Sequence, residues 1–138
     1  MKPVLLDASA IVALLDRSET YHDAAVAAVA ELAAPLITCE PVIAEACYLL
    51  RRVDGAGEAI VENVETGIFQ IPFRLAESAR EVRRLMHKYR DHAIDLADAC
   101  LIHLANEFGA GQILTLDRDF RIFRWGRNQA FDLMIPLT

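Results

Sequence analysis

Short apolar runs alternate with longer amphipathic segments along the whole chain, and this alternation constrains the fold more than any other feature. The first run, residues 4–6, is uniformly apolar and ends at Asp7, which is typical of a strand buried on both faces. Strands that alternate with helices predict a parallel sheet, and right-handed crossovers place helices on both of its faces. We therefore predict an α/β fold, a three-layer α/β/α sandwich around a central, mostly parallel five-stranded sheet.

The limits of the predicted elements come from where each apolar pattern starts and stops. Strands are expected at residues 4–6, 36–38, 68–71, 113–116 and 133–135. Helices are expected at residues 9–15, 22–32, 41–52, 58–65, 75–89 and 94–108. Asp7 or Ser9 would cap the first helix, and Pro41 suits the first turn of the third, where no backbone donor is needed. The 138 residues show no repeat or linker, so we expect one domain over 1–138.

Charge and cysteine content narrow the class of protein. The chain carries 20 acidic and 14 basic residues, a net charge of −6, which argues against binding nucleic acid by bulk charge alone. The three cysteines are widely spaced and form no CxxC pair, as expected for small core residues in a reducing compartment. No apolar run approaches the roughly 20 residues that span a bilayer, and no cleavable signal is evident. We predict a soluble cytoplasmic domain without a membrane partner.

Four carboxylates occupy positions where an acidic side chain needs a reason. Asp7 and Asp117 follow the first and fourth predicted strands, although a helix cap or a turn would explain either one alone. Glu45 and Asp98 lie in apolar stretches of predicted helices and have no basic residue at helical spacing. An unpaired buried carboxylate is costly, so a structural role explains these two less well. Asp95, near the start of its helix, is explained by a capping or dipole role.

The predicted fold brings these four carboxylates together. The carboxyl ends of parallel strands meet at one edge of the sheet, and the helices that carry Glu45 and Asp98 begin near that edge. Clustered carboxylates repel one another and need cations, and hard oxygen ligands suit Mg²⁺ or Mn²⁺. Zinc is not favoured because no Cys or His pair has ligand spacing. Carboxylate-held divalent ions are suited to the hydrolysis of phosphodiesters.

At these same residues the sequence resembles the PIN-domain ribonucleases, and among them the VapC-type toxins of prokaryotic type II toxin–antitoxin systems. The resemblance lies in four segments, residues 5–11, 41–45, 96–99 and 115–120, which occur in the family's order. Each segment is weak alone, and the four together are specific. The resemblance implies a PIN-like sandwich and a metal-dependent endoribonuclease.

The resemblance also implies roles for individual residues. The active site would consist of Asp7, Glu45, Asp98 and Asp117 and would hold one or two Mg²⁺ or Mn²⁺ ions. Asp7 and Asp98 would be the principal metal ligands and Asp117 would complete the cage, while Glu45 would act through a water or a second ion. Ser9 and Thr115 stand where hydroxyls hydrogen-bond the carboxylates or the phosphate, and Asp119 would be an outer ligand.

Partners are implied in the same way: an RNA substrate, tRNA or rRNA, a cognate antitoxin, and a second copy of the chain in a homodimer or a larger toxin–antitoxin assembly. Arg118, Arg121 and Arg124 recur every three residues after Asp117 and could contact RNA, or they could form a solvated face over a core that contains Phe120 and Phe123. The apolar residues Tyr48, Leu49 and Leu50 could bind an antitoxin helix or pack in the core.

Two other functions remain open at this point. The same fold and site would serve an RNA-processing nuclease outside any toxin–antitoxin pair. A non-catalytic Mg²⁺-binding module, such as a phosphate-receiver-like domain, fits less well. A receiver domain needs a lysine after its last strand, and the only lysines here are Lys2 and Lys88.

Overall fold

A five-stranded parallel sheet forms the centre of the molecule. The computed structural model describes residues 1–137; Thr138, the last residue of the predicted domain, lies outside them. The strands are β1 (Val4–Leu6), β2 (Leu36–Ile37), β3 (Phe69–Gln70), β4 (Gln112–Leu114) and β7 (Asp132–Leu133). Their order is β3-β2-β1-β4-β7, and all four neighbouring pairs are parallel. The predicted α/β fold is confirmed, and this sheet is parallel throughout.

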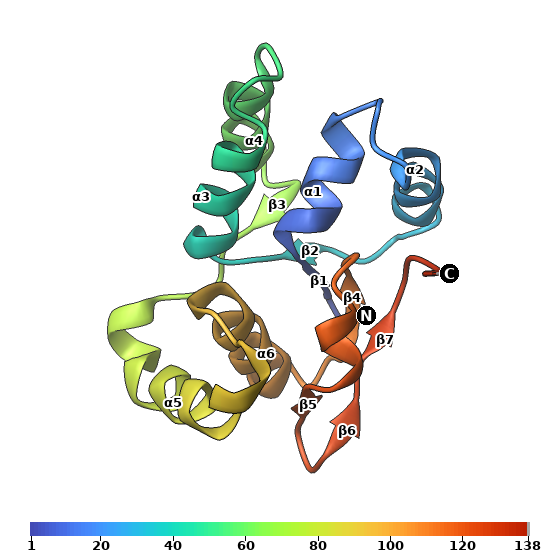
Figure 1. The fold of residues 1–138 in the computed structure, drawn as a ribbon. Helices are drawn as coiled ribbons and strands as arrows, with labels where there is room; N and C mark the ends of the chain where they lie inside the picture. Colours follow the sequence, from blue (N-terminus) through green and yellow to red (C-terminus); the bar gives the residue numbers. More distant parts are fainter. Residues whose placement is uncertain (138) are drawn as a thin grey trace.

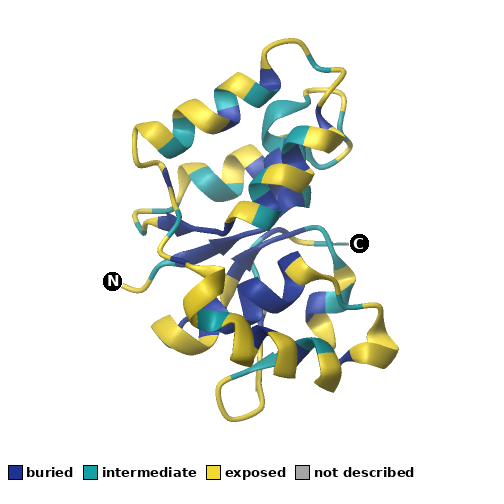
Figure 2. Cartoon of the chain, turned by 90° about the vertical axis from the view of Figure 1, so that its left-hand side faces the viewer, coloured by how far each residue is buried: buried dark blue, intermediate teal, exposed yellow. Residues whose placement is uncertain are grey.

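Helices cover both faces of this sheet (Figures 1 and 2). One layer contains α1 (Ala8–Leu15), α2 (His22–Ala30), α3 (Glu40–Leu49) and α4 (Ala56–Glu65). The other contains α5 (Leu75–Lys88) and α6 (Leu96–Phe108), with α6 between α5 and the sheet. Because α6 contacts the sheet on one side and α5 on the other, nine of its consecutive residues, 97–105, are buried.

The strand order creates a topological switch between β1 and β4. From β1 the chain moves outward to β2 and β3, and from β4 it moves the other way to β7. The loops that leave β1 and β4 therefore part at the carboxyl edge of the sheet, which is where α/β proteins place their ligands. The backbone N–H of Asp7 donates to the carbonyl of Leu114 at 3.0 Å, so the ends of the two strands are joined at this point.

Several elements are shorter than their apolar patterns predict. The helix expected at 41–52 ends at Leu49, because Leu50 turns into the core and residues 51–55 form a turn. The helix expected at 94–108 begins only at Leu96, where the side chain of Asp95 caps it. The sheet strands have only two or three residues each. The apolar runs are longer than the strands, because buried residues continue beyond the last residue that pairs with a neighbouring strand.

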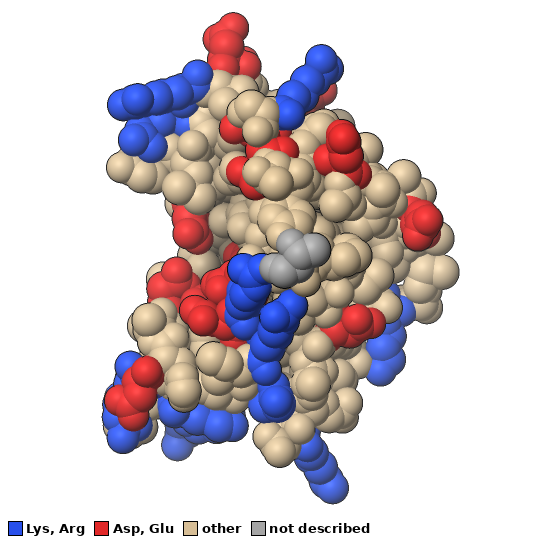
Figure 3. Space-filling model, turned by 45° about the vertical axis from the view of Figure 1, so that its right-hand side comes forward, with Lys and Arg blue, Asp and Glu red and all other residues tan. Residues whose placement is uncertain are grey.

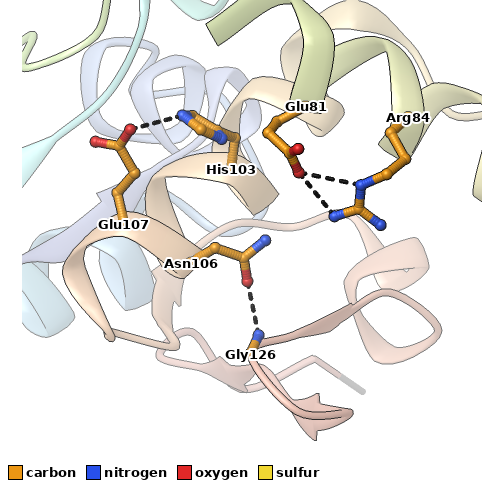
Figure 4. A network of polar contacts seen from close by, with 6 residues as sticks. All are labelled: Glu81, Arg84, His103, Asn106, Glu107 and Gly126. Atoms are coloured by element: carbon orange, nitrogen blue, oxygen red, sulfur yellow. Dashed lines mark hydrogen bonds and ion pairs between the residues drawn. The ribbon is translucent and has the colours of Figure 1, made fainter.

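An antiparallel hairpin and two 3-10 turns have no counterpart in the prediction. The hairpin pairs β5 (Arg124–Trp125) with β6 (Gln129–Ala130), and the 3-10 turns are η1 (Arg90–His92) and η2 (Arg118–Arg121). Two-residue strands leave no alternating pattern for a sequence to show. The side chain of Asn106 on α6 fastens the hairpin, because its Oδ1 accepts a hydrogen bond from the N–H of Gly126 at 2.6 Å (Figure 4).

Gly111 allows this hairpin to lie against the start of β4. A Cβ at position 111 would come within 2.1 Å of Trp125 Nε1, whose indole also donates to the carbonyl of Ala130. Gly111→Ala is therefore expected to displace the indole and to lower the free energy of unfolding by about 1–3 kcal/mol. Trp125 is the chain's only tryptophan, so chemical denaturation followed by its fluorescence measures both effects.

Gly57 on α4 provides the control for that substitution. A Cβ there meets nothing within 4 Å, so Gly57→Ala should leave Trp125 unchanged and raise stability by about 0.5–1 kcal/mol through helix propensity. Equal stability of Gly111→Ala and the wild type, with an unshifted emission maximum, would contradict the contact between Gly111 and Trp125.

Two further predictions concerned the burial of the cysteines and the absence of a membrane-spanning segment. Cys39 and Cys100 are buried, Cys47 is half-buried, and all three are free thiols, as expected for core residues. Within residues 1–137, none of the helices is both long enough and apolar enough to cross a bilayer.

Candidate active site

Asp7 sits at the centre of the carboxyl edge, held in place by three elements. It is the N-cap of α1, and its Oδ1 accepts from the N–H of Ala8 at 2.8 Å. Its Oδ2 accepts from Thr115 Oγ1 at 2.6 Å and, at 3.4 Å, from Ser9 Oγ. Burial raises the pKa of this carboxyl, and the hydrogen bonds from Thr115 and Ala8 act against that rise. Asp7 therefore has the capping role that the sequence offered as one explanation, and it is also buried at the edge of the sheet.

Ser9 and Thr115 connect the two strand ends beneath Asp7. Their hydroxyls lie 3.3 Å apart, and each accepts a backbone hydrogen bond from the loop after β4: Ser9 from Leu116 at 2.9 Å, Thr115 from Asp117 at 3.0 Å. These bonds place both hydroxyls where the sequence predicted them, in contact with a site carboxylate. The loop that carries Asp117 is thereby aligned with Asp7.

Asp98 lies in the first turn of α6 and forms a capping box with Asp95. The N–H of Asp98 donates to Asp95 Oδ1 at 2.8 Å, and the N–H of Asp95 donates to Asp98 Oδ2 at 3.3 Å. Asp98 is only 7% exposed, and its burial, with the charge of Asp95 next in size, raises its pKa to about 8. Its Oδ1 accepts no hydrogen bond from residues 1–137 and is available to a ligand.

Asp117 and Asp119 lie at the rim of the site. Asp117 precedes η2, and its Oδ1 accepts from the N–H of Asp119 at 2.9 Å. Its pKa is raised by partial burial and by the charges of Asp119 and Asp95. Asp119 raises the pKa of Asp117 but is not among the charges that act on Asp7, Glu45 or Asp98. This agrees with ranking Asp119 outside the four principal carboxylates.

The apolar neighbours of Glu45 gave a wrong expectation of its burial. Val42 and Ala46 are fully buried, but Glu45 is exposed, because it points about 100° around α3 from Ala46 and so lies off the buried face. Its pKa is nevertheless raised, first by partial desolvation and then by the charges of Asp95, Asp7 and Asp117. Glu45 is therefore close enough to the other carboxylates to feel their charge, and it lies on the solvent side of the group.

The four carboxylates form one electrostatic cluster, in which the charges of other carboxylates raise the pKa of each. Asp7, Glu45, Asp98 and Asp117 come from four separate parts of the chain, yet all have a raised pKa, and every charge that acts on them is another carboxylate. Asp95 acts on all four, so it belongs to the cluster as well as to the cap that the sequence suggested. The signal that could have found it was its spacing of three residues from Asp98. Figure 3 shows acidic side chains gathered in a hollow of the surface.

The donor set suits a hard divalent cation held partly through water. Five acidic side chains in mutual repulsion, two of them almost fully buried, gain from a cation, and their oxygens are the ligands that Mg²⁺ and Mn²⁺ prefer. Within residues 1–137, however, the structure forms no ready-made group of three or more acidic, His or Cys side chains able to hold an ion. Mg²⁺ commonly retains several waters, which can bridge such gaps.

The arginines beside the cluster divide into two kinds. Arg118 and Arg121 are exposed on η2, directly after Asp117. Arg124 is half-buried, and its Nη1 donates to the carbonyls of Arg121, Ile122 and Phe123, which gives it a structural role in this turn. Phe120 and Phe123 are fully buried and pack edge to face, as the core interpretation predicted.

The model of the PIN domain family matches residues 4–125 of the sequence. The chain belongs to this family. This PIN domain is 31% identical over 117 residues to Ribonuclease VapC26 of Mycobacterium tuberculosis, over 83% of this chain and 87% of that protein. Its fold is similar to the crystal structure of M. tuberculosis VapC20, a toxin described as cleaving the sarcin–ricin loop, with a TM-score of 0.76 at 18% identity over 84% of this chain and 91% of that one.

Proposed function

We propose that this PIN domain is a metal-dependent endoribonuclease that hydrolyses phosphodiester bonds in RNA, tRNA or rRNA, as the toxin of a cytoplasmic toxin–antitoxin pair. The observation that carries the proposal is the cluster of Asp7, Glu45, Asp98 and Asp117 at the topological switch, each with a raised pKa. The names of the similar proteins, a ribonuclease and a loop-cleaving toxin, support RNA as the substrate.

The side chains have separate roles in the proposed reaction. Asp7, Asp98 and Asp117 would hold one or two Mg²⁺ or Mn²⁺ ions. A bound divalent ion lowers the pKa of an attacking water and stabilises negative charge on the phosphate. Ser9 and Thr115 hold Asp7 in a single orientation through their hydroxyls. Glu45 is the exposed member and would act at the substrate's side of the site, through a water or a second ion.

Partners follow from the proposal and from the surface of α3 and α4. Tyr48 and Leu49 are 62% and 50% exposed, whereas Leu50 is buried, so the structure divides the three apolar residues that the sequence left open. Tyr48, Leu49 and, on α4, Val61 are exposed apolar side chains that an antitoxin helix would cover. We further propose a homodimer as the active form. Arg118 and Arg121 would contact the RNA next to Asp117.

The proposed function is tested with the purified chain and an end-labelled pool of structured cellular RNA. Cleavage is expected with Mg²⁺ or Mn²⁺ and is expected to stop when EDTA removes the ion, because the carboxylates alone supply no activated water. Discrete new RNA ends, mapped by sequencing, would show endonucleolytic cutting. Intact RNA under all metal conditions would overturn the enzymatic part of the proposal.

The toxin role is tested separately in cells. Induced expression should arrest growth, and co-expression of a small protein encoded directly upstream should relieve the arrest. Cleavage in vitro without growth arrest would contradict the toxin role and favour an RNA-processing nuclease.

A further inference from the structure

Positive charge is concentrated on α5 and the residues that flank it, although the protein as a whole is acidic. Six of the chain's 14 lysines and arginines lie between residues 74 and 90, where there are only two acidic residues, Glu77 and Glu81. The six are Arg74, Arg80, Arg83, Arg84, Lys88 and Arg90, all of them exposed. With a net charge of −6 over the whole chain, the rest of the molecule is correspondingly more acidic. Residues 74–90 are therefore a candidate binding surface for a polyanion.

Packing does not require these charges. The buried residues of α5 are Val82 and Leu85, which face α6, and Figure 1 shows α5 on the outside of the molecule. Arg80, Arg83 and His87 follow one another at helical spacing and, with Arg84 and Glu81, line a shallow hollow on the solvent side. Their side chains therefore present donors to solvent along one continuous face.

Only part of this charge is neutralised within the protein. Arg84 donates to Glu81 at 2.9 and 3.0 Å (Figure 4), and Arg74 pairs with Glu77 at 3.3 Å. Arg80 and Arg83 make no hydrogen bond or ion pair with any residue in 1–137. Like charges three or four residues apart destabilise a helix by a few tenths of a kcal/mol each, so folding alone does not favour this arrangement.

The carboxyl end of α5 leads toward the active site. Tyr89 packs against Phe123 with ring centroids 5.1 Å apart, and its hydroxyl accepts from the N–H of Arg124 at 2.9 Å. The chain then passes through η1 to Asp95, the cap of α6. The carboxyl end of α5 therefore lies beside the residues that follow η2, the turn that bears Arg118 and Arg121 after Asp117. Along α5, the basic face from Arg80 to Lys88 is about 12 Å long at the helical rise.

We propose that the solvent face of α5, through Arg80, Arg83 and Arg84, binds the phosphate backbone of the RNA substrate at a distance from the cleaved bond. This inference rests on the proposed function and deepens it. Guanidinium groups suit phosphates because they donate in a planar fork, and such contacts position an RNA without reading its bases. The surface would favour structured RNAs long enough to reach from the carboxylate cluster to α5.

The test compares two double variants that each remove two charges. Arg80→Gln with Arg83→Gln alters α5, and Arg51→Gln with Arg52→Gln removes an exposed pair from the turn between α3 and α4. Binding of a fluorescein-labelled RNA hairpin is measured by anisotropy in EDTA at several salt concentrations, so cleavage does not interfere. Circular dichroism confirms that both variants are folded.

The α5 variant is expected to bind the hairpin on the order of tenfold more weakly at 0.1 M salt, with a salt slope smaller by about 1.4–1.8. With Mg²⁺, it should cleave the hairpin with a raised KM and an unchanged kcat, because the contact is the same in the ground and transition states. The control variant should retain most of the affinity.

Unchanged affinity and salt slope in the α5 variant would overturn the proposal and would leave an acidic protein as the partner of this face. An equal loss in both double variants would also overturn it, because general charge would then explain binding. If the wild type neither binds nor cleaves RNA, the proposed function itself fails. If the wild type cleaves RNA and the α5 variant binds and cleaves it equally well, only the proposal about α5 fails.

Discussion

Asp7→Asn is expected to reduce RNA cleavage about 1000-fold or more while leaving the fold intact or more stable. Asp7 is 5% exposed and stands between the two strand ends that define the site. Losing a ligand that fixes a divalent ion removes several kcal/mol of transition-state stabilisation. The amide oxygen can still accept from Ala8, and burial no longer opposes a charge, so the fold loses little. Initial rates on a defined RNA and thermal denaturation measure the two effects.

Asp54→Asn provides the matched control, because it makes the same chemical change at an exposed position in the turn between α3 and α4. It should cleave RNA at the wild-type rate. An Asp7→Asn protein that cuts as fast as the wild type with Mg²⁺ would remove Asp7 from the catalytic site. One that is inactive but unfolded would show instead that the hydrogen bond from Thr115 is structurally essential.

The elements that have a regular pattern of apolar residues were predictable from the sequence. Each strand of the sheet and each of the six helices overlaps the range that an apolar pattern gave it, because burial of a strand or a helix face imposes a regular spacing. The last strand is the least accurate: β7 is Asp132–Leu133, whereas 133–135 was expected, because Met134 and Ile135 continue the apolar run beyond the paired residues. The hairpin of β5 and β6 was not predictable, since it depends on two long-range facts: the hydrogen bond from Gly126 to Asn106 and the space that Gly111 leaves for Trp125.

Within the site, strand ends were more informative than local apolarity. Asp7 and Asp117 were placed by topology, which sequence order and crossover handedness largely determine. Glu45 was misjudged because neighbours in sequence say little about which side of a helix a residue faces. Asp95 was assigned only to capping because its hydrogen bond to Asp98 explains it locally, whereas its electrostatic effect on Asp7 and Asp117 arises from tertiary structure.

The stability of the metal-free protein is expected to fall as the pH rises from about 4 to above 8. Asp98 has a folded-state pKa of about 8 against an ordinary value of 3.8, and burial and repulsion also raise the pKa of Asp7. A raised folded pKa means that the folded state holds protons that the unfolded state has released. The stability is therefore fully present near pH 4 and is lost as these groups ionise. The loss should be on the order of 1–3 kcal/mol, or roughly 5–10 °C in Tm.

Mn²⁺ should reverse this loss at pH 8, since a cation replaces the protons as the partner of the carboxylates. At 100 times its Kd the ion would add about 2.7 kcal/mol. Scanning calorimetry at pH 6 and pH 8, with EDTA or with MnCl₂, measures the effect without any RNA. Asp98→Asn is the decisive control, because it removes the carboxyl whose pKa is raised to about 8 and should flatten the pH dependence while weakening the Mn²⁺ shift. A wild-type Tm that is equal at both pH values and indifferent to Mn²⁺ would mean that the carboxylates do not share one electrostatic environment, and the proposed metal site would be untenable.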